Sequence, residues 1–105
     1  MKLGICSMWG DLLDGFREEV RLASDLGFEL ISVGDSPAGW HELYVSLTLA
    51  ALDAPKATLA PLVTSPFMRH PLVTASALST IDDLSGGRVA LGLATGGSTV
   101  MAIGR

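Results

Sequence analysis

The sequence predicts an α/β fold in which short parallel strands alternate with helices. Four apolar runs of strand length alternate with three stretches of helical spacing, so the expected order is βαβαβαβ, an alternation that implies a parallel sheet with right-handed crossovers. The composition agrees, because hydrophobic residues make up 49% of the chain and aromatic residues only 6%, which suits buried parallel strands covered by helices. At 105 residues the chain forms one domain at most.

The first half of the chain is expected to contain two strands, each followed by a helix. Residues 2–7 form the first strand, in which Gly4 marks a place where another group packs closely against the backbone. Residues 12–26 carry apolar side chains at helical spacing and end at a glycine, a natural helix stop. The second strand is expected at residues 28–33. The helix at residues 42–52 is nearly all apolar, so it is expected to be covered by other elements.

The second half is expected to add a strand, a helix and another strand. Residues 59–63 are apolar and short enough for a buried strand. Pro71 then opens a helix, where its fixed φ and missing N–H cost nothing, and the helix runs to about Leu84. The glycine pair that follows suits a helix C-cap, since glycine adopts the left-handed conformation. Residues 88–94 restart as an apolar strand, which is expected to lie beside the preceding one.

Charge and cysteine content argue against several classes of function. The net charge of −4 comes from 11 acidic and 7 basic residues, and no basic stripe gathers on any predicted face, so nucleic acid is not an expected partner. The first apolar run is too short for a secretory signal or a membrane span, so a cytoplasmic location without membrane association is expected. Cys6 is the only cysteine, which excludes an intrachain disulfide. Neither His41 nor His70 has a second ligand at metal spacing, so no metal site is predicted.

One long segment carries a family resemblance. Residues 64–98 read TSPFMRHPLVTASALSTIDDLSGGRVALGLATGGS, and Gly34-Asp35-Ser36-Pro37 follows the second predicted strand. In this order the motifs resemble the luciferase-like monooxygenase superfamily, which contains bacterial luciferase, FMN-dependent monooxygenases and F420-dependent reductases and dehydrogenases. The resemblance covers essentially the whole chain.

This resemblance implies a (β/α)₈ TIM barrel, which needs about 250 residues, so the chain is expected to be its N-terminal half. The expected content is four strands and three helices, with the chain ending before a fourth helix that would begin within residues 98–105. The resemblance also implies a flavin- or F420-dependent oxidoreductase that transfers a hydride to, or inserts oxygen into, a small organic substrate. The implied cofactor is F420 or FMN, and nothing in the sequence separates the two.

The active face of such a barrel lies at the C-terminal ends of its strands. Met8 and Trp9 follow the first strand and are expected to wall a substrate pocket, with a place in the core as the alternative. The last strand is followed by four residues whose N–H groups and hydroxyls could hold an anion: Thr95, Gly96, Gly97 and Ser98. From the residues alone, a glycine pair after a strand more often forms just a tight turn. The resemblance implies that this strand end contacts the flavin or deazaflavin.

Asp35 and Ser36 end the second predicted strand and are expected to contact the cofactor. Asp35 could hydrogen-bond a ring nitrogen, a hydroxyl or an N–H group, whereas the residues alone also suggest an Asx turn or a helix cap before Pro37. The resemblance adds that some F420-dependent relatives place a catalytic histidine directly after this acidic residue. Ser36 occupies that position here, so no catalytic residue is assigned.

Pro61 and Leu62 end the third predicted strand and are also expected to contact the cofactor. The resemblance implies a bulge with a non-proline cis peptide bond between them that presses on the ring, whereas the residues alone favour an ordinary trans strand with Pro61 at a bulge. Arg69 and His70 precede the helix-opening proline and are expected to fix the helix start and to pair with an acid. His41 is expected at the rim of the active face, either touching substrate or starting a helix.

A second function remains open, in which the chain is a non-catalytic half-barrel that self-associates through its open sheet edges and at most binds cofactor weakly. In such barrels the phosphate tail of the cofactor and much of the substrate site draw on later βα loops. Two half-barrels could restore a closed barrel by dimerisation, so a homo-oligomer is the expected assembly.

Overall fold

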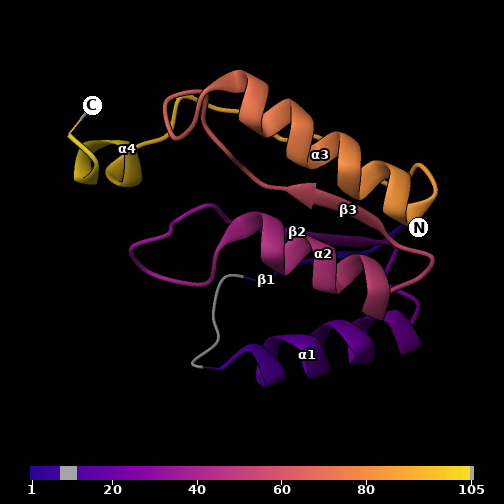
Figure 1. The fold of residues 1–105 in the computed structure, drawn as a ribbon. Coiled ribbons are helices and arrows are strands. Elements are labelled where there is room, and N and C mark those ends of the chain that lie inside the picture. Colours follow the sequence, from indigo (N-terminus) through magenta and orange to yellow (C-terminus); the bar gives the residue numbers. More distant parts are fainter. Residues whose placement is uncertain (8–11, 105) are drawn as a thin grey trace.

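The computed structural model describes residues 1–7 and 12–104, with Ser98 described by its backbone alone. Strands and helices alternate along the chain from the N-terminus to α3 (Figure 1). The elements of the described chain are β1 (Gly4–Ser7), α1 (Leu13–Asp25), β2 (Leu30–Val33), α2 (Leu43–Asp53), β3 (Thr58–Pro61), α3 (Pro71–Ser85) and α4 (Ser98–Ala102).

The strands of the described chain form one parallel sheet in the order β1-β2-β3. Gly4 pairs with Leu30, and Leu30 pairs with Thr58, so the first residues of the three strands are in register. A Cβ atom on Gly4 would lie 2.8 Å from the Cβ atom of Leu30, which confirms the close packing predicted from this glycine. The parallel α/β arrangement predicted from the alternating pattern is confirmed.

The predicted fourth strand, residues 88–94, is not a regular strand. One isolated bridge joins Val89 to Leu59 of β3, and another joins Leu93 to Thr64 beyond the end of β3. The N–H of Gly92 donates to the Pro61 carbonyl at 3.0 Å, and the Gly92 carbonyl accepts from the N–H of Thr64 at 2.9 Å. Gly92 therefore pairs with both Pro61 and Thr64, and Leu62 and Val63 between these two partners bulge out of the strand pairing. We refer to these two residues as the bulge.

The end of the described chain also differs from the prediction. The sequence predicts that the chain ends before a fourth helix, whereas the structure has the five-residue helix α4 at Ser98–Ala102. The N–H of Met101 donates to the carbonyl of Gly97 at 3.1 Å, which is the spacing of an α-helical hydrogen bond, so the helix starts directly after the glycine pair.

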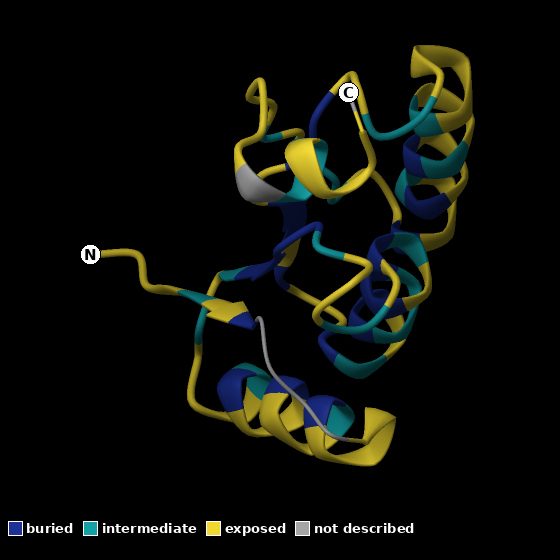
Figure 2. Ribbon diagram, turned by 90° about the vertical axis from the view of Figure 1, so that its left-hand side faces the viewer, coloured by how far each residue is buried: buried dark blue, intermediate teal, exposed yellow. Residues whose placement is uncertain are grey.

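The helices α1, α2 and α3 lie on one face of the sheet, with α2 between the other two (Figure 1). The buried residues follow β2, β3 and the inner faces of these helices, as the dark blue segments of Figure 2 show, whereas only Ser7 of β1 is buried. Phe16 and Val20 of α1 and Leu47 of α2 pack with Ile31 and Leu59 of the strands in one hydrophobic core. The prediction that the apolar helix at residues 42–52 would be covered is therefore confirmed for its inner face, whereas Val45 and Leu52 are 53% and 58% exposed.

Both ends of α3 follow from local chemistry. His70 caps the start, because its Nδ1 accepts from the N–H of Leu72 at 3.1 Å, and Pro71 occupies the first helical position. Gly86 ends the helix with a φ of 73°, the left-handed conformation that the glycine pair predicts. The prediction that His70 fixes the helix start is confirmed.

An ion pair fastens α1 to α2. Arg17 donates from Nε and Nη2 to the carboxylate of Asp53 at 2.7 and 2.9 Å, and Arg21 lies 3.3 Å from the same carboxylate. The hydrogen bonds from Arg17 hold the pKa of Asp53 below its usual range. Asp53 is the last residue of α2, so the pair lies at the opposite end of that helix from the loop that follows β2.

Candidate functional site

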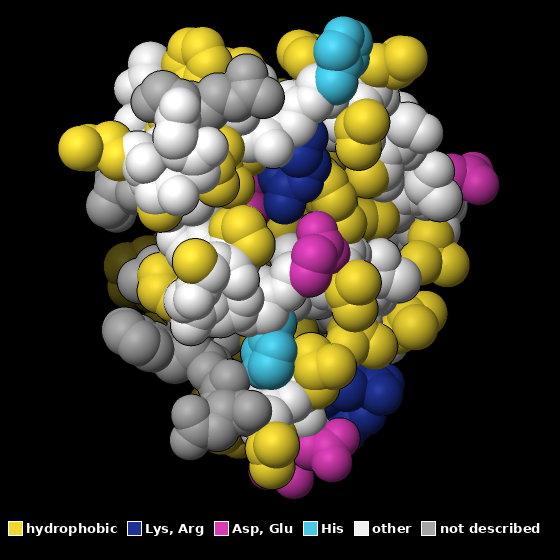
Figure 3. Space-filling view, turned by 60° about the vertical axis from the view of Figure 1, so that its left-hand side comes forward, with side chains coloured by type: hydrophobic (Ala, Val, Ile, Leu, Met, Phe, Trp, Pro, Cys, Tyr) yellow, Lys and Arg dark blue, Asp and Glu magenta, His cyan; other side chains and the backbone are white. Residues whose placement is uncertain are grey.

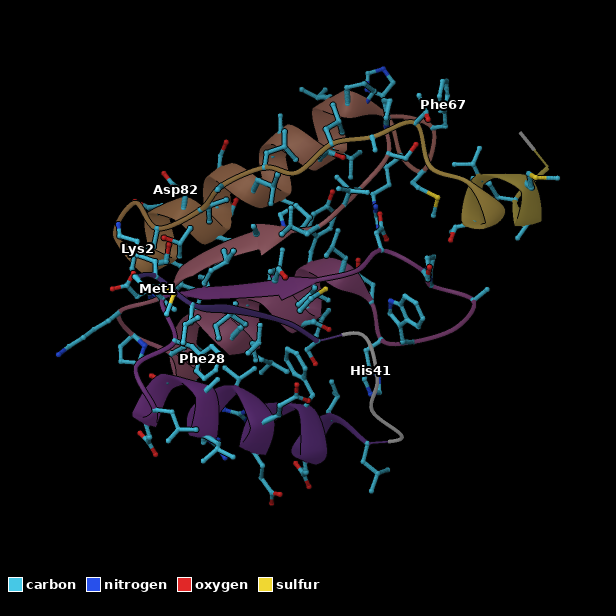
Figure 4. The ribbon with its side chains drawn as sticks, turned by 180° about the vertical axis from the view of Figure 1, so that it is seen from behind. Met1, Lys2, Phe28, His41, Phe67 and Asp82 are labelled. Atoms are coloured by element: carbon cyan, nitrogen blue, oxygen red, sulfur yellow. The ribbon has the colours of Figure 1, made fainter. Side chains whose placement is uncertain are left out.

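A cleft of about 200 Å³ opens at the carboxyl ends of β2 and β3. Its walls come from the loop after β2, from the bulge and the residues that follow it, and from the glycine turn before α4. Figure 4 labels Phe67 and His41 at this end of the molecule, and Met1 and Lys2 at the opposite end. The residues of the cleft used below are Ser36, Leu62, Val63, Gly96, Gly97 and Thr99.

The structure brings most of the predicted cofactor residues to this cleft. Asp35, Ser36, Leu62, Gly96 and Gly97 all line it.

The other predicted site residues lie beside the cleft or outside the described chain. Pro61 is fully buried as the last residue of β3. Thr95 lies next to the cleft, where its carbonyl accepts from the hydroxyl of Ser65 at 2.9 Å. The side chain of Ser98 lies outside the described part of the chain, as do the predicted substrate-pocket residues Met8 and Trp9.

The bulge provides the apolar wall of the cleft. Leu62 and Val63 are 40% and 43% exposed, and both line the cleft. A non-proline cis peptide bond is present, but it joins Leu62 to Val63, so its predicted position between Pro61 and Leu62 is wrong by one residue. Pro61 stays in register with Val33, and the N–H of Leu62 still donates to the Val33 carbonyl at 2.9 Å, so the strand breaks only after Leu62.

Asp35 is engaged by protein groups on both carboxylate oxygens. Its Oδ2 accepts from the Thr64 hydroxyl at 2.6 Å and from Arg69 Nη1 at 2.6 Å, while Oδ1 accepts from Arg69 Nη2 at 2.9 Å. Its side chain is 1% exposed. The prediction that Arg69 pairs with an acid is confirmed, and the acid is Asp35. Hydrogen bonding to Asp35 raises the pKa of the Arg69 guanidinium above its usual range.

Arg69 also reaches the start of α2. Its Nη2 lies 3.5 Å from Oε1 of Glu42, and its guanidinium stands over the ring of Tyr44, 4.6 Å from the ring centre. Glu42 in turn caps α2 by accepting from the N–H of Val45 at 2.7 Å. A single arginine therefore connects the loop after β2, the loop after β3 and the first turn of α2.

Hydroxyl groups close the other side of the cleft. The hydroxyls of Ser36 and Thr99 lie 2.8 Å apart and join the loop after β2 to α4. Gly96 has a φ of 77°, and a Cβ atom there would lie 2.5 Å from Cγ2 of Val100 and 3.2 Å from Cβ of Ser65. Only glycine fits this turn without displacing its neighbours.

Arg69 and Thr99 contribute to the site, although the sequence assigns neither of them to it. The signal for Arg69 was present in the motif Arg69-His70-Pro71, which places a cation one residue before a helix cap. Thr99 carries no such signal, because it meets Ser36 across 63 residues of chain.

Among the described residues, no group of three or more histidine, cysteine, aspartate or glutamate side chains could hold a metal ion. In the same part of the chain, no helix is long and apolar enough to cross a membrane.

Parallel strands that alternate with helices, with a cleft at the carboxyl ends of the strands, define the class of β/α-barrel proteins that bind ligands at that face. Residues 1–104 match the luciferase-like monooxygenase family, and the chain belongs to that family. The resemblance carried by residues 64–98 is thereby confirmed.

Two curated relatives are similar to most of the chain. The 5,10-methylenetetrahydromethanopterin reductase of Methanopyrus kandleri is 42% identical over 77 residues, which are 73% of this chain and 22% of the relative. The protein of the same name from Archaeoglobus fulgidus is 40% identical over 77 residues, again 73% of this chain and 23% of the relative. The chain therefore spans less than a quarter of the length of these relatives.

Solved structures show the same fold. The coenzyme F420-dependent tetrahydromethanopterin reductase from Methanopyrus kandleri superposes with a TM-score of 0.90 at 35% identity, over 98% of this chain and 30% of that one. The oxygenating constituent of 3,6-diketocamphane monooxygenase from Pseudomonas putida, in complex with FMN, superposes with a TM-score of 0.82 over 99% and 33%. Its 18% identity shows the fold alone. The predicted fold class, the parallel N-terminal half of a β/α barrel, is confirmed.

Proposed function

We propose that the chain forms the ring-binding wall of the cofactor site in an F420- or FMN-dependent oxidoreductase that acts on a small organic molecule. The observation that carries the proposal is the bulge, which presents two half-exposed apolar side chains at the strand ends, between a rim of hydroxyls and an open glycine turn. When bound, such a cofactor supplies hydride transfer or oxygen activation. The cytoplasmic location expected from the sequence belongs to the same proposal.

The residues of the cleft fit the ring part of such a cofactor. Leu62 and Val63 offer an apolar surface against which a flat aromatic ring can pack. No atom lies within 4 Å of the place where a Cβ atom on Gly97 would stand, so the backbone there is open to a ligand. The cleft of about 200 Å³ is smaller than the roughly 300–1,000 Å³ of complete ligand sites, so the ring would be held here and the phosphate tail elsewhere.

We propose F420 ahead of FMN, and the similarity to named relatives supports this choice. The relatives that are 40% and 42% identical are named as methylenetetrahydromethanopterin reductases, and the solved reductase at 35% identity is F420-dependent. The FMN-bound neighbour supports only the fold. We therefore expect a reductase that moves a hydride, with oxygen insertion as the alternative reaction.

A titration of the purified chain with F420, and separately with FMN, tests the proposal through the fluorescence of the cofactor. Far-UV circular dichroism first establishes that the material is folded. We expect saturable binding of F420 at micromolar affinity, weakened by Gly96→Ala. The matched control is Gly15→Ala in α1, where an added Cβ atom meets nothing within 4 Å, and affinity should stay unchanged. Folded protein that binds neither cofactor would contradict the proposal.

A second candidate function is favoured by the apolar surface that remains uncovered. Exposed hydrophobic side chains are spread widely over the face shown in Figure 3. Leu91 and Leu93 are 53% and 55% exposed and line an apolar groove of about 160 Å³ beside α3. We infer that the chain alternatively acts as a non-catalytic half-barrel that covers this surface with a second copy of itself. Sedimentation equilibrium should then show concentration-dependent dimers, and a folded monomer at all concentrations would contradict this candidate.

A further inference from the structure

We propose that Arg69 is a positioning residue for the candidate cofactor site, because through Asp35 and Thr64 it holds the bulge in place relative to the loop after β2. The inference rests on the function proposed above, in which the bulge is the surface that supports the ring. Arg69 does not itself line the cleft, so it acts on a ligand only through the residues that do.

The pair of Asp35 and Arg69 joins two walls of the cleft. Asp35 follows β2, whereas Arg69 directly precedes the cap of α3, 34 residues further along the chain. Two parallel hydrogen bonds, of 2.6 and 2.9 Å, connect them, and their side chains are 1% and 17% exposed. Charge-assisted bonds in this paired geometry are directional, and burial limits competition from water. The paired hydrogen bonds therefore fix the distance between the loop after β2 and the loop after β3.

Thr64 links Asp35 to the backbone beside the bulge. Its hydroxyl donates to Asp35 at 2.6 Å, its N–H donates to the Gly92 carbonyl at 2.9 Å, and its carbonyl accepts from the N–H of Ala94 at 3.0 Å. Every polar group of this buried residue is engaged, and Val63 of the bulge is its direct neighbour in the chain. A shift of Asp35 would therefore move the backbone from which the bulge projects.

The contacts require a guanidinium and not merely a positive charge. The planar group donates twice to Asp35 while it stands over the ring of Tyr44 and approaches Glu42 at 3.5 Å. A lysine ammonium can form one short bond to the carboxylate but cannot reproduce the paired bonds and the stacking together. We therefore expect Arg69→Lys to fall between wild type and Arg69→Met in every measurement below.

The chain contains its own matched control. Arg17 makes a second two-point pair with Asp53, at 2.7 and 2.9 Å, which fastens α1 to α2 away from the strand ends. Arg17→Met therefore removes the same chemistry from a place that contributes nothing to the cleft. An effect that comes only from losing an arginine–aspartate pair should appear in both Arg69→Met and Arg17→Met, whereas an effect on the cleft should appear in Arg69→Met alone.

Amide hydrogen exchange of the full chain tests positioning without any cofactor. In Arg69→Met we expect the amides of Thr64 and Ala94 to exchange about tenfold faster than in Arg17→Met, after correction for global stability by the slowest core amides. Equal exchange in the two variants would overturn the inference. Should Arg69→Met not fold, Thr64→Val removes the hydrogen bonds of the hydroxyl to Asp35 and to Arg69 Nη1 and keeps the ion pair. The same acceleration at Ala94 is then expected, and unchanged exchange there would overturn the inference.

Titration with F420 then connects positioning to the proposed site. We expect the Kd for F420 to rise about tenfold or more in Arg69→Met and to change less than about twofold in Arg17→Met. An unchanged Kd in Arg69→Met would overturn the link between Arg69 and the site. If the wild-type chain binds neither F420 nor FMN, the proposed function fails, and the exchange measurement still decides whether Arg69 orders the bulge.

Discussion

Replacing Arg88 by methionine should destabilise the fold by about 2–4 kcal/mol, because this side chain donates hydrogen bonds to backbone carbonyls of several elements at once. Its Nη1 donates to the carbonyls of Ala54 and Ala57 at 2.7 and 2.6 Å, and its Nη2 donates to that of Ala51 at 3.0 Å. Its Nε donates to the carbonyl of Ser85 at 2.7 Å. Arg88 therefore ties the end of α2, the start of β3 and the end of α3 to the segment at residues 88–94.

The size of the effect follows from the acceptors that would lose their donor. The carbonyls of Ala51, Ala57 and Ser85 would lose the donor that Arg88 provides, whereas the carbonyl of Ala54 would keep the N–H of Ala57 at 3.3 Å. The Ala51 carbonyl lies in the last turn of α2, where the carbonyls of a helix have no partner within it. Each buried carbonyl left without a donor costs about 1–3 kcal/mol. These costs do not add fully, since water reaches part of the half-buried site, so we expect roughly half of their sum. A domain of this size has about 5–15 kcal/mol of total stability.

Urea unfolding followed by far-UV circular dichroism at pH 7 measures this loss. With a slope of about 1–3 kcal/mol per molar, the midpoint of Arg88→Met should fall by at least about 0.7 M. Arg88→Lys should lose less, since a cation remains near the C-terminus of α2. The control is Arg21→Met, which removes an exposed guanidinium 3.3 Å from Asp53 and should cost under about 0.5 kcal/mol. A change as small as the control's in Arg88→Met would refute the reasoning.

Three further predictions concern pH, the glycine turn and self-association. Asp53→Asn should make the free energy of unfolding depend less on pH at acid pH. Because the pKa of Asp53 is lowered in the folded protein, its carboxylate stabilises the fold above about pH 4 and loses this effect as the pH falls through the pKa of the folded state. The urea midpoints at pH 7 and pH 3 should therefore differ less in the variant than in the wild type. Gly96→Val should lower the urea midpoint and raise the Kd for F420 about tenfold or more, because the residue has a φ of 77° and a Cβ atom would lie 2.5 Å from Val100; an unchanged Kd would contradict the assignment of this turn to the site. Leu91→Glu combined with Leu93→Glu should weaken any dimer seen by sedimentation equilibrium, and undiminished association would place the interface elsewhere.

The alternation of strands and helices could be predicted because each boundary has a local cause. Gly27 and Gly86 adopt positive φ after α1 and α3, and Pro71 occupies the first helical position of α3. The prediction of a regular fourth strand was wrong because the pairing of this segment depends on residues far away in the chain. The bulge exists because Pro61 and Thr64 share the partner Gly92, a pairing across about 30 residues that no local pattern of apolar residues expresses.

The site was predictable in its location but not in its contacts. Parallel strands bring their carboxyl ends to one edge, so Asp35, Leu62 and Gly96 could be assigned to a common face from their place after a strand. The partner of Arg69 could not be chosen from sequence, because 11 acidic residues compete for it and only the fold selects Asp35. The roles predicted for Met8 and Trp9 stay predictions, since both residues lie outside the described chain.

The two arginine networks at the ends of β3 have separable consequences. Arg88 lies where β3 begins and bonds mainly to backbone carbonyls of the fold, whereas Arg69 lies beyond its end and bonds to the side chains that order the cleft. Arg88 connects the end of α2, the start of β3 and the end of α3, whereas Arg69 connects the loop after β2 to the loop after β3, so the two networks act at opposite ends of one short strand. Loss of Arg88 should therefore lower stability and leave the Kd for F420 of the remaining folded molecules unchanged. Loss of Arg69 should raise that Kd by more than its effect on stability explains.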